Sequence, residues 1–186
     1  MKRRLTVALI VAALLWFYMF SPWTAGLTNF WLTMTASALI LTAMALFFSP
    51  EKPPSVDRPL WQILSGILIA LILWGIFWVG DKVSALLFDF ARPEVDSIYS
   101  MKTGLPPYAI AALLLLVIGP AEEFFWRGYV QRTMVKLFGG GKRPQDKSFV
   151  LTAIIYASVH VWSLNFMLVM AALVAGCVWG LLYRLQ

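Results

Sequence analysis

Residues 5–50 read LTVALIVAALLWFYMFSPWTAGLTNFWLTMTASALILTAMALFFSP, the longest stretch of the sequence without a charged side chain. A transmembrane α-helix needs about 20 consecutive, mostly apolar residues to cross a hydrocarbon core about 30 Å thick. Two such helices fit into this stretch, and the Pro and Gly within residues 21–26 mark the break between them. The stretch therefore predicts two membrane spans, at residues 5–20 and 27–48.

Three further stretches lack Asp, Glu, Lys and Arg and predict the remaining spans. They cover residues 59–80, 103–121 and 148–183, and the last contains His160, the one histidine of the chain. The fold class that follows is an all-α, polytopic transmembrane helix bundle of about six spans, forming a single integral-membrane domain, residues 1–186. The further spans are expected at residues 60–80, 106–121 with a polar extension, 148–163 and 166–184.

The composition excludes a water-soluble domain. Of the 186 residues, 61% are hydrophobic and 13% are charged, whereas soluble domains have about 25% charged residues. The formal net charge is +6, from 15 Lys and Arg against nine Asp and Glu. Basic cytoplasmic loops give a membrane protein the same excess. We therefore expect the lipid bilayer as a partner, and no nucleic acid.

Lys and Arg are unevenly shared between the two sides of the predicted bundle. Twelve of the 15 lie in segments on the side of the N-terminus, and the other three lie in the opposite loop, residues 81–102. Because cytoplasmic loops carry the excess of Lys and Arg, we expect both termini to be cytoplasmic. The compact chain favours a multi-pass protein of a bacterial inner membrane. The basic segments are residues 1–4, 49–59, 122–147 and 184–186.

Residues 119–129, GPAEEFFWRGY, place two adjacent carboxylates directly after an apolar span. An ionisable side chain in a membrane segment is costly and by default marks a functional site. On a helix, Glu123 and Arg127 form an i,i+4 pair with the acid on the favoured N-terminal side. Glu122 lies about 100° further round the helix, so it stays available to exchange a proton, as a general base requires. The alternative is that both acids lie in water at an ordinary helix start.

The histidine is expected at the depth of the acid pair. The glycines at residues 139–141 indicate a turn, so the helices on either side of it should be antiparallel. Counted from Arg143, Glu123 lies 20 residues back and His160 lies 17 residues forward, so at about 1.5 Å per residue the two can face each other. Tyr156, one turn before the histidine, can stack on or orient the imidazole. The alternative is a packing histidine, hydrogen-bonded within the core.

A metal site is a weaker explanation of these side chains. Two carboxylates and one histidine can hold iron or zinc in principle, but the sequence has no HExxH pattern and Arg127 would repel a cation. The single cysteine, Cys177, excludes a disulfide framework and a multi-cysteine metal site within this sequence. We therefore expect no metal and no cofactor.

The pattern Glu122-Glu123-x-x-x-Arg127, followed by Tyr156-x-x-x-His160, resembles two motifs of the CAAX protease and bacteriocin-processing (CPBP) family. Those motifs are EExxxR and FxxxH, and the family comprises glutamic intramembrane endopeptidases. The resemblance implies that Glu122 activates a water molecule and that His160 assists it or stabilises the developing charge. It implies that Glu123 and Arg127 hold the geometry. The supporting residues are Tyr156 and Trp126.

The resemblance extends beyond the two motifs. Residues 126–131, WRGYVQ, and residues 176–184, GCVWGLLYR, look like the usual continuations of the first and second motifs. It covers about residues 100–186, the expected catalytic core, whereas residues 1–100 match only as generic membrane helices. The third motif of the family is a His with an Asn or Asp four residues later. It is expected after Gln186, so the core should be incomplete at its C-terminus.

The leading hypothesis is an intramembrane endopeptidase that hydrolyses a peptide bond in a membrane-associated protein or peptide. The alternative is a non-catalytic immunity or scaffold protein that binds a peptide in the same cavity. A proton-coupled transporter would also use buried carboxylates, but the sequence shows no inverted repeat of the kind found in transporters.

Overall fold

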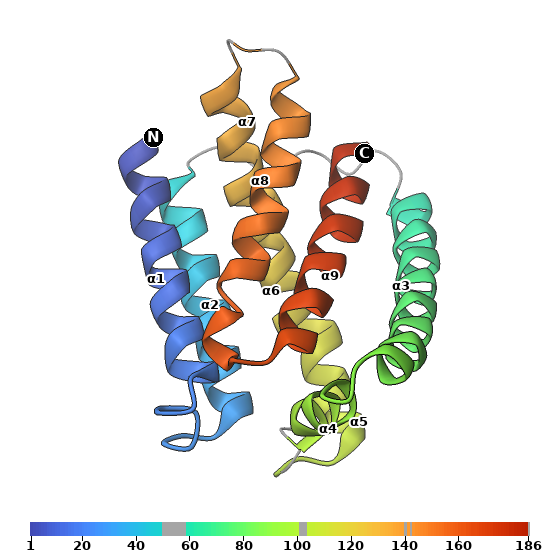
Figure 1. The fold of residues 1–186 in the computed structure, drawn as a ribbon. Coiled ribbons are helices and arrows are strands. Elements are labelled where there is room, and N and C mark those ends of the chain that lie inside the picture. Colours follow the sequence, from blue (N-terminus) through green and yellow to red (C-terminus); the bar gives the residue numbers. More distant parts are fainter. Residues whose placement is uncertain (50–58, 101–103, 140, 142, 186) are drawn as a thin grey trace.

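The computed structural model describes residues 1–49, 59–100, 104–139, 141 and 143–185, and these residues form helices with no strand (Figure 1). This confirms the all-α class. The α-helices are α1 (Lys2–Phe20), α2 (Phe30–Phe48), α3 (Pro59–Leu87), α4 (Ala91–Ser100), α5 (Pro107–Leu113), α6 (Gly119–Glu123), α7 (Arg132–Phe138), α8 (Pro144–Ser158) and α9 (Phe166–Leu185). Two π-helical segments, η1 (Leu114–Ile118) and η2 (Phe124–Gln131), and one 3₁₀ turn, η3 (Val161–Ser163), complete them.

Five helices within the described residues are long and apolar enough to cross a membrane, which confirms a polytopic bundle. They are Lys2–Phe20, Phe30–Phe48, Leu60–Leu87, Pro107–Phe138 and Phe166–Leu185.

The sixth expected span, residues 148–163, differs from the prediction. α8 has 15 residues and is therefore about 22 Å long, which is shorter than a hydrocarbon core of about 30 Å. It ends at Ser158, so His160 lies in the turn after the helix. α8 still runs antiparallel to its neighbours, and both chain termini lie at the same end of the bundle (Figure 1).

One continuous helix of 32 residues, Pro107–Phe138, carries the acid pair. Its middle departs from α-helical hydrogen bonding because Pro120 has no N–H to donate. In η1 and η2 the bonds run from residue i to i+5, and the N–H of Gly119 donates to the carbonyl of Leu114. A Cβ at Gly119 would lie 2.7 Å from that carbonyl oxygen, so the close approach requires glycine.

The largest cluster of buried apolar side chains lies where α1, α2 and η2 meet. Ala8 and Ala12 of α1 are fully buried, and Trp16, one turn further on, is 1% exposed. Its indole ring meets that of Trp126 in η2 edge to face, with the centroids 6.1 Å apart. The two alanines thus allow α1 to pack closely against its neighbours. Trp16 makes the contact with η2, which belongs to the same continuous helix as the acid pair.

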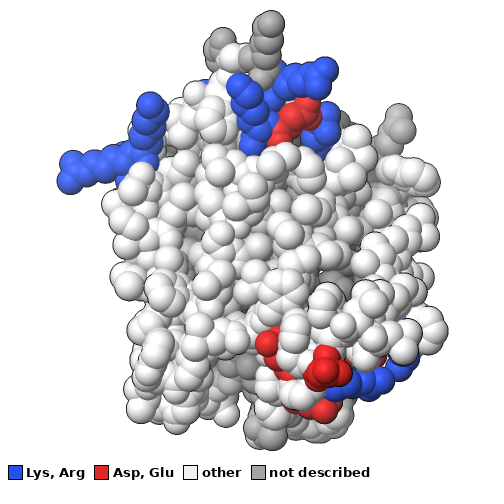
Figure 2. Space-filling view, viewed as in Figure 1, with Lys and Arg blue, Asp and Glu red and all other residues white. Residues whose placement is uncertain are grey.

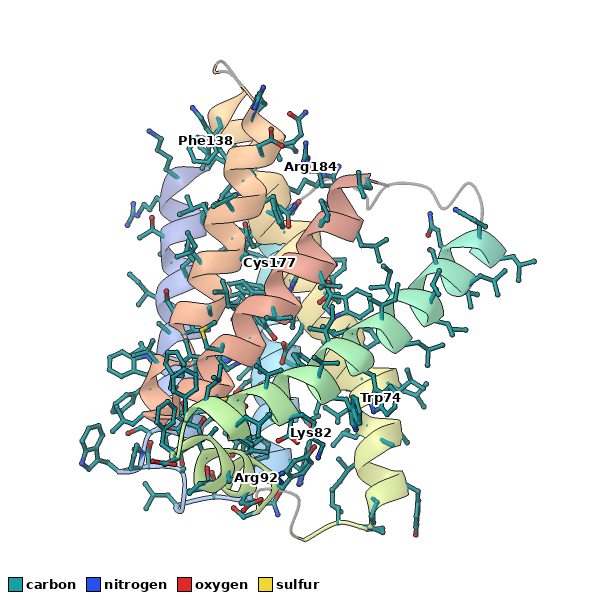
Figure 3. All side chains as sticks on the ribbon, turned by 45° about the vertical axis from the view of Figure 1, so that its right-hand side comes forward. Trp74, Lys82, Arg92, Phe138, Cys177 and Arg184 are labelled. Carbon is teal, nitrogen blue, oxygen red and sulfur yellow. The ribbon has the colours of Figure 1, made fainter. Side chains whose placement is uncertain are left out.

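The helix α3 lies at the edge of the bundle, where its described neighbours include α4 and α9. Its 29 residues span about 44 Å, longer than the bilayer core, so it must tilt. Figure 3 shows α3 strongly inclined to α9, with Trp74 on its surface. The Trp74 side chain is 68% exposed, as is typical of a residue in contact with lipid.

The start of α9 is held by α4. The side chain of Asn165 accepts a hydrogen bond from the N–H of Leu168 (2.8 Å) and donates to the carbonyl of Glu94 (2.9 Å). The carboxylate of Glu94 accepts from the N–H of Met167 (2.8 Å). These bonds satisfy N–H groups that a helix start leaves without partners, and they fix the position of α9.

Candidate active site

The glutamate pair lies at the end of α6, where the helix passes into η2. The carboxylate of Glu123 and the guanidinium of Arg127 form the expected ion pair, with Nη1 and Oε1 3.2 Å apart. The Arg127 side chain is 4% exposed, whereas that of Glu123 is 38% exposed. The guanidinium of Arg127 is therefore buried, whereas the Glu123 side chain is partly exposed at the surface.

Arg127 also joins η2 to α9. Its Nη2 donates to the carbonyl oxygens of Ala175 (3.5 Å) and Gly176 (3.4 Å). One turn later, Nε2 of Gln131 donates to the carbonyl of Gly180 (3.1 Å). The two glycines are buried, and a Cβ at either would contact a side chain of α8 at 3.2 Å or less. The small residues of α9 thus bring its backbone against the site.

Glu122 is bound by Tyr156 of α8, whose hydroxyl donates to Oε2 of the carboxylate at 3.0 Å. The guanidinium of Arg127 lies over the tyrosine ring, 5.1 Å from its centroid, a distance typical of a cation–π contact. The two glutamates, the arginine and the tyrosine therefore form one cluster. The hydrogen bond to the carboxylate of Glu122 that the described residues show comes from an uncharged hydroxyl, whereas Glu123 meets a charged guanidinium.

Trp126 and Tyr156 form the apolar side of this cluster. Trp126 is fully buried, and its ring meets that of Tyr156 edge to face, with the centroids 5.2 Å apart. The indole thus packs against the tyrosine whose hydroxyl donates to Glu122.

His160 lies next to Tyr156 but is not joined to the acid pair. Its ring is 5.1 Å from the tyrosine ring, and its Nδ1 is 2.8 Å from the backbone carbonyl of Tyr156. Its Nε2 accepts a hydrogen bond from the indole N–H of Trp16 at 3.1 Å. No hydrogen bond between Glu122 and the imidazole is present, although the structure describes both residues. The expected facing of the histidine and the acid pair thus involves no direct hydrogen bond between these described residues, and Tyr156 contacts both groups.

Tyr156, one helical turn before His160, is the residue of α8 that meets the acid pair. Its hydroxyl donates to Glu122 and its ring contacts the imidazole, so Tyr156 provides the link between the two.

The sequence argument missed two contributions to the site. Trp16 is one, because an aromatic residue in a membrane span is usually interpreted as an interfacial or lipid-facing residue. Its spacing from Ala8 and Ala12 was the available signal, since a stripe of small residues indicates a packed face. The backbone carbonyls of Ala175 and Gly176 are the other, and a sequence gives no direct sign of them.

Within the described ranges, no group of three or more His, Cys, Asp and Glu side chains is gathered as a metal ion would require. The cluster instead offers one carboxylate held by a hydroxyl and a second neutralised by a guanidinium. Such an arrangement can accept a proton from water and return it to a leaving group.

Comparison with known proteins gives a family for the part of the chain that holds this cluster. The family model described as type II CAAX prenyl endopeptidase Rce1-like matches residues 104–186. Neither the curated proteins nor the solved structures gave a match. The matched residues include the glutamate pair, Arg127, Tyr156 and His160. Residues 104–186 thus match the model of the Rce1-like family, in agreement with the resemblance of their motifs.

Proposed function

We propose that the protein is an intramembrane endopeptidase that hydrolyses a peptide bond in a membrane-associated protein or peptide, with Glu122 as the general base. The observation that carries this proposal is the unequal pair of carboxylates in an apolar helix of the matched segment. The guanidinium of Arg127 pairs with Glu123 at 3.2 Å, while the carboxylate of Glu122 accepts a hydrogen bond from the uncharged hydroxyl of Tyr156. An ionisable group is retained at such a place for a function.

The reaction can be written with these groups. Glu122 takes a proton from a water molecule, and the hydroxide attacks the carbonyl carbon of the scissile bond. The resulting tetrahedral intermediate collapses when the carbon–nitrogen bond breaks and Glu122 returns the proton to the leaving amine. The hydroxyl of Tyr156, which is 3.0 Å from the carboxylate, orients the base. Glu123 and Arg127 hold the helix in position, and His160 holds Tyr156 by ring contact and through its carbonyl.

We further propose that the protein lies in a bacterial inner membrane with both termini in the cytoplasm. Lys and Arg gather at the end of the bundle where the termini lie, and most visible Asp and Glu lie at the opposite end (Figures 1 and 2). This distribution supports the orientation, because cytoplasmic segments carry the basic excess.

The test is cleavage of a prenylated peptide with a CAAX C-terminus by the full chain in lipid vesicles. Glu122→Gln keeps the shape of the side chain and removes the base, so the rate should fall by about 10² or more. Asp146→Asn is the matched control, because it changes another carboxylate, paired with Arg184 at the end of the bundle. Cleavage by Glu122→Gln at the wild-type rate would reject the assignment.

One observation favours the alternative of a non-catalytic peptide-binding protein. Both ring nitrogens of His160 have partners other than the acid pair, as in a histidine that serves packing. The same experiment separates the two functions. A wild-type protein that binds the peptide and leaves it intact is the immunity or scaffold protein.

A further inference from the structure

The imidazole of His160 is held from both of its nitrogens by groups with opposite roles. The carbonyl oxygen of Tyr156 can only accept, so Nδ1 must carry the proton of the 2.8 Å bond. The indole N–H of Trp16 can only donate, so Nε2 must offer its lone pair at 3.1 Å. Together the two partners select one neutral tautomer, with the proton on Nδ1.

The hydrogen bond between Trp16 and His160 lies in the buried core of the bundle. Trp16 is 1% exposed and His160 is 6% exposed, so water does not compete for the bond between them. The indole also meets the imidazole edge to face, with centroids 5.9 Å apart, and it meets Trp126 in the same way at 6.1 Å. Phe20, one turn later in α1, covers the imidazole at 5.5 Å. The ring is therefore fixed in direction as well as in tautomer.

The contacts continue from the imidazole to the carboxylate. His160 contacts the ring and the backbone carbonyl of Tyr156, and the Tyr156 hydroxyl donates to Glu122. A change in the orientation of the imidazole would therefore shift the ring of Tyr156, whose hydroxyl orients the base. Trp16 lies in α1, which is outside the segment that matches the family model.

We propose that Trp16 is a positioning residue of the site, which fixes the Nδ1–H tautomer of His160 and through it the orientation of Tyr156 and Glu122. The kinetic part of this inference rests on the proposed function, and the tautomer part does not. The first hundred residues would then supply a group that the catalytic segment needs.

Selective ¹⁵N labelling of histidine tests the tautomer directly, because the chain contains a single histidine. In the wild-type protein in lipid bicelles, we expect Nδ1 to be protonated and Nε2 to show the shift of a hydrogen-bond acceptor. A wild-type spectrum with the proton on Nε2 would overturn the proposal without any variant.

Trp16→Phe removes the donor and keeps an aromatic ring. We expect the Nε2 signal to move and the second tautomer to become populated. Trp31→Phe is the matched control, because Trp31 is also buried and its indole N–H has no partner among the described residues. An unchanged histidine spectrum in Trp16→Phe overturns the proposal.

The kinetic arm measures peptide cleavage by the same three proteins. We expect Trp16→Phe to lower kcat about five- to tenfold, as the loss of one buried hydrogen bond suggests, with little change in KM, and Trp31→Phe to match the wild type. A changed tautomer with unchanged kcat would overturn the positioning role. Absence of cleavage by the wild type, together with the expected spectrum, would reject the proposed function and leave the tautomer assignment in place.

Discussion

At the scale of single residues, the two glutamates differ because of their partners. Glu123 meets a buried guanidinium, which is itself held by two backbone carbonyls of α9. Among the described residues, Glu122 instead accepts a hydrogen bond from the hydroxyl of Tyr156. Adjacent side chains of the same chemistry thus have different surroundings, since one pairs with a charged group and the other with an uncharged one.

Tyr156→Phe tests the importance of that hydroxyl. The change removes one hydrogen bond to a charged group, and such a bond contributes about 1.5–3 kcal/mol. We therefore expect kcat for peptide cleavage to fall by about one to two orders of magnitude.

Tyr129→Phe is the control for this substitution. Tyr129 is also buried on the helix of the acid pair, and its ring packs against Phe125 and Phe48 rather than against Glu122. We expect it to cleave the peptide at the wild-type rate. Equal rates for wild type and Tyr156→Phe would show that the hydroxyl does not orient the base.

The ion pair of the candidate site could be predicted from the sequence. Glu123 and Arg127 form the predicted pair because the i,i+4 spacing brings two side chains together in almost any helical turn. The partner of Glu122 could not be predicted in the same way. It depends on how α8 packs against η2, and the hydrogen bond of His160 comes from Trp16, a residue 144 positions away in the chain.

At the scale of the elements, the helix Pro107–Phe138 shows what periodicity can and cannot reveal. The length of the stretch without charged residues predicted the membrane span, and the polar extension after it is also helical. The π-helical hydrogen bonds near Pro120 depend on its missing N–H, and the pattern of hydrophobic residues does not indicate this effect. The same limit explains α3, which runs to Leu87, seven residues beyond the predicted end at residue 80, through the charged pair Asp81 and Lys82.

Gly119→Ala tests the close approach inside this helix. The added Cβ would lie 2.7 Å from the carbonyl oxygen of Leu114, a backbone atom that cannot move away independently. We expect the free energy of unfolding to fall by about 1–3 kcal/mol, as is usual for overpacking. Chemical or thermal unfolding in detergent micelles measures it.

Gly75→Ala in α3 is the matched glycine substitution. No heavy atom outside the helix lies within 4 Å of the added Cβ, and alanine favours a helix by about 0.5–1 kcal/mol over glycine. The protein should therefore become slightly more stable. A Gly119→Ala protein as stable as Gly75→Ala would contradict the close approach.

At the scale of the whole molecule, charge divides the bundle into two ends (Figure 2). Arg184 lies at the end with the termini, whereas Lys82 and Arg92 lie at the opposite end (Figure 3). Five membrane-length helices together with the shorter α8 return the chain to its starting side (Figure 1). The candidate site then lies inside the bundle, on the helix Pro107–Phe138, which runs from one end of the bundle to the other.

Cysteine labelling tests the orientation in intact cells. With Cys177→Ala as background, Arg143→Cys should react with a membrane-impermeant thiol reagent only after the inner membrane is opened. Lys82→Cys should react before that, because this end of α3 is expected outside. The reverse pattern would place both termini outside the cytoplasm.

The segment Leu114–Ile118 has a consequence for how the protein tolerates change. In an α-helix each residue turns the chain by about 100°, and a five-residue π turn takes up one residue more than an α turn does. Loss of a single residue there would convert the π turn into an α turn and leave the segments on either side close to their present orientation. A one-residue deletion should therefore be accepted better in this segment than in the α-helical parts of the same helix, where each lost residue rotates the preceding segment by about 100° relative to the glutamates.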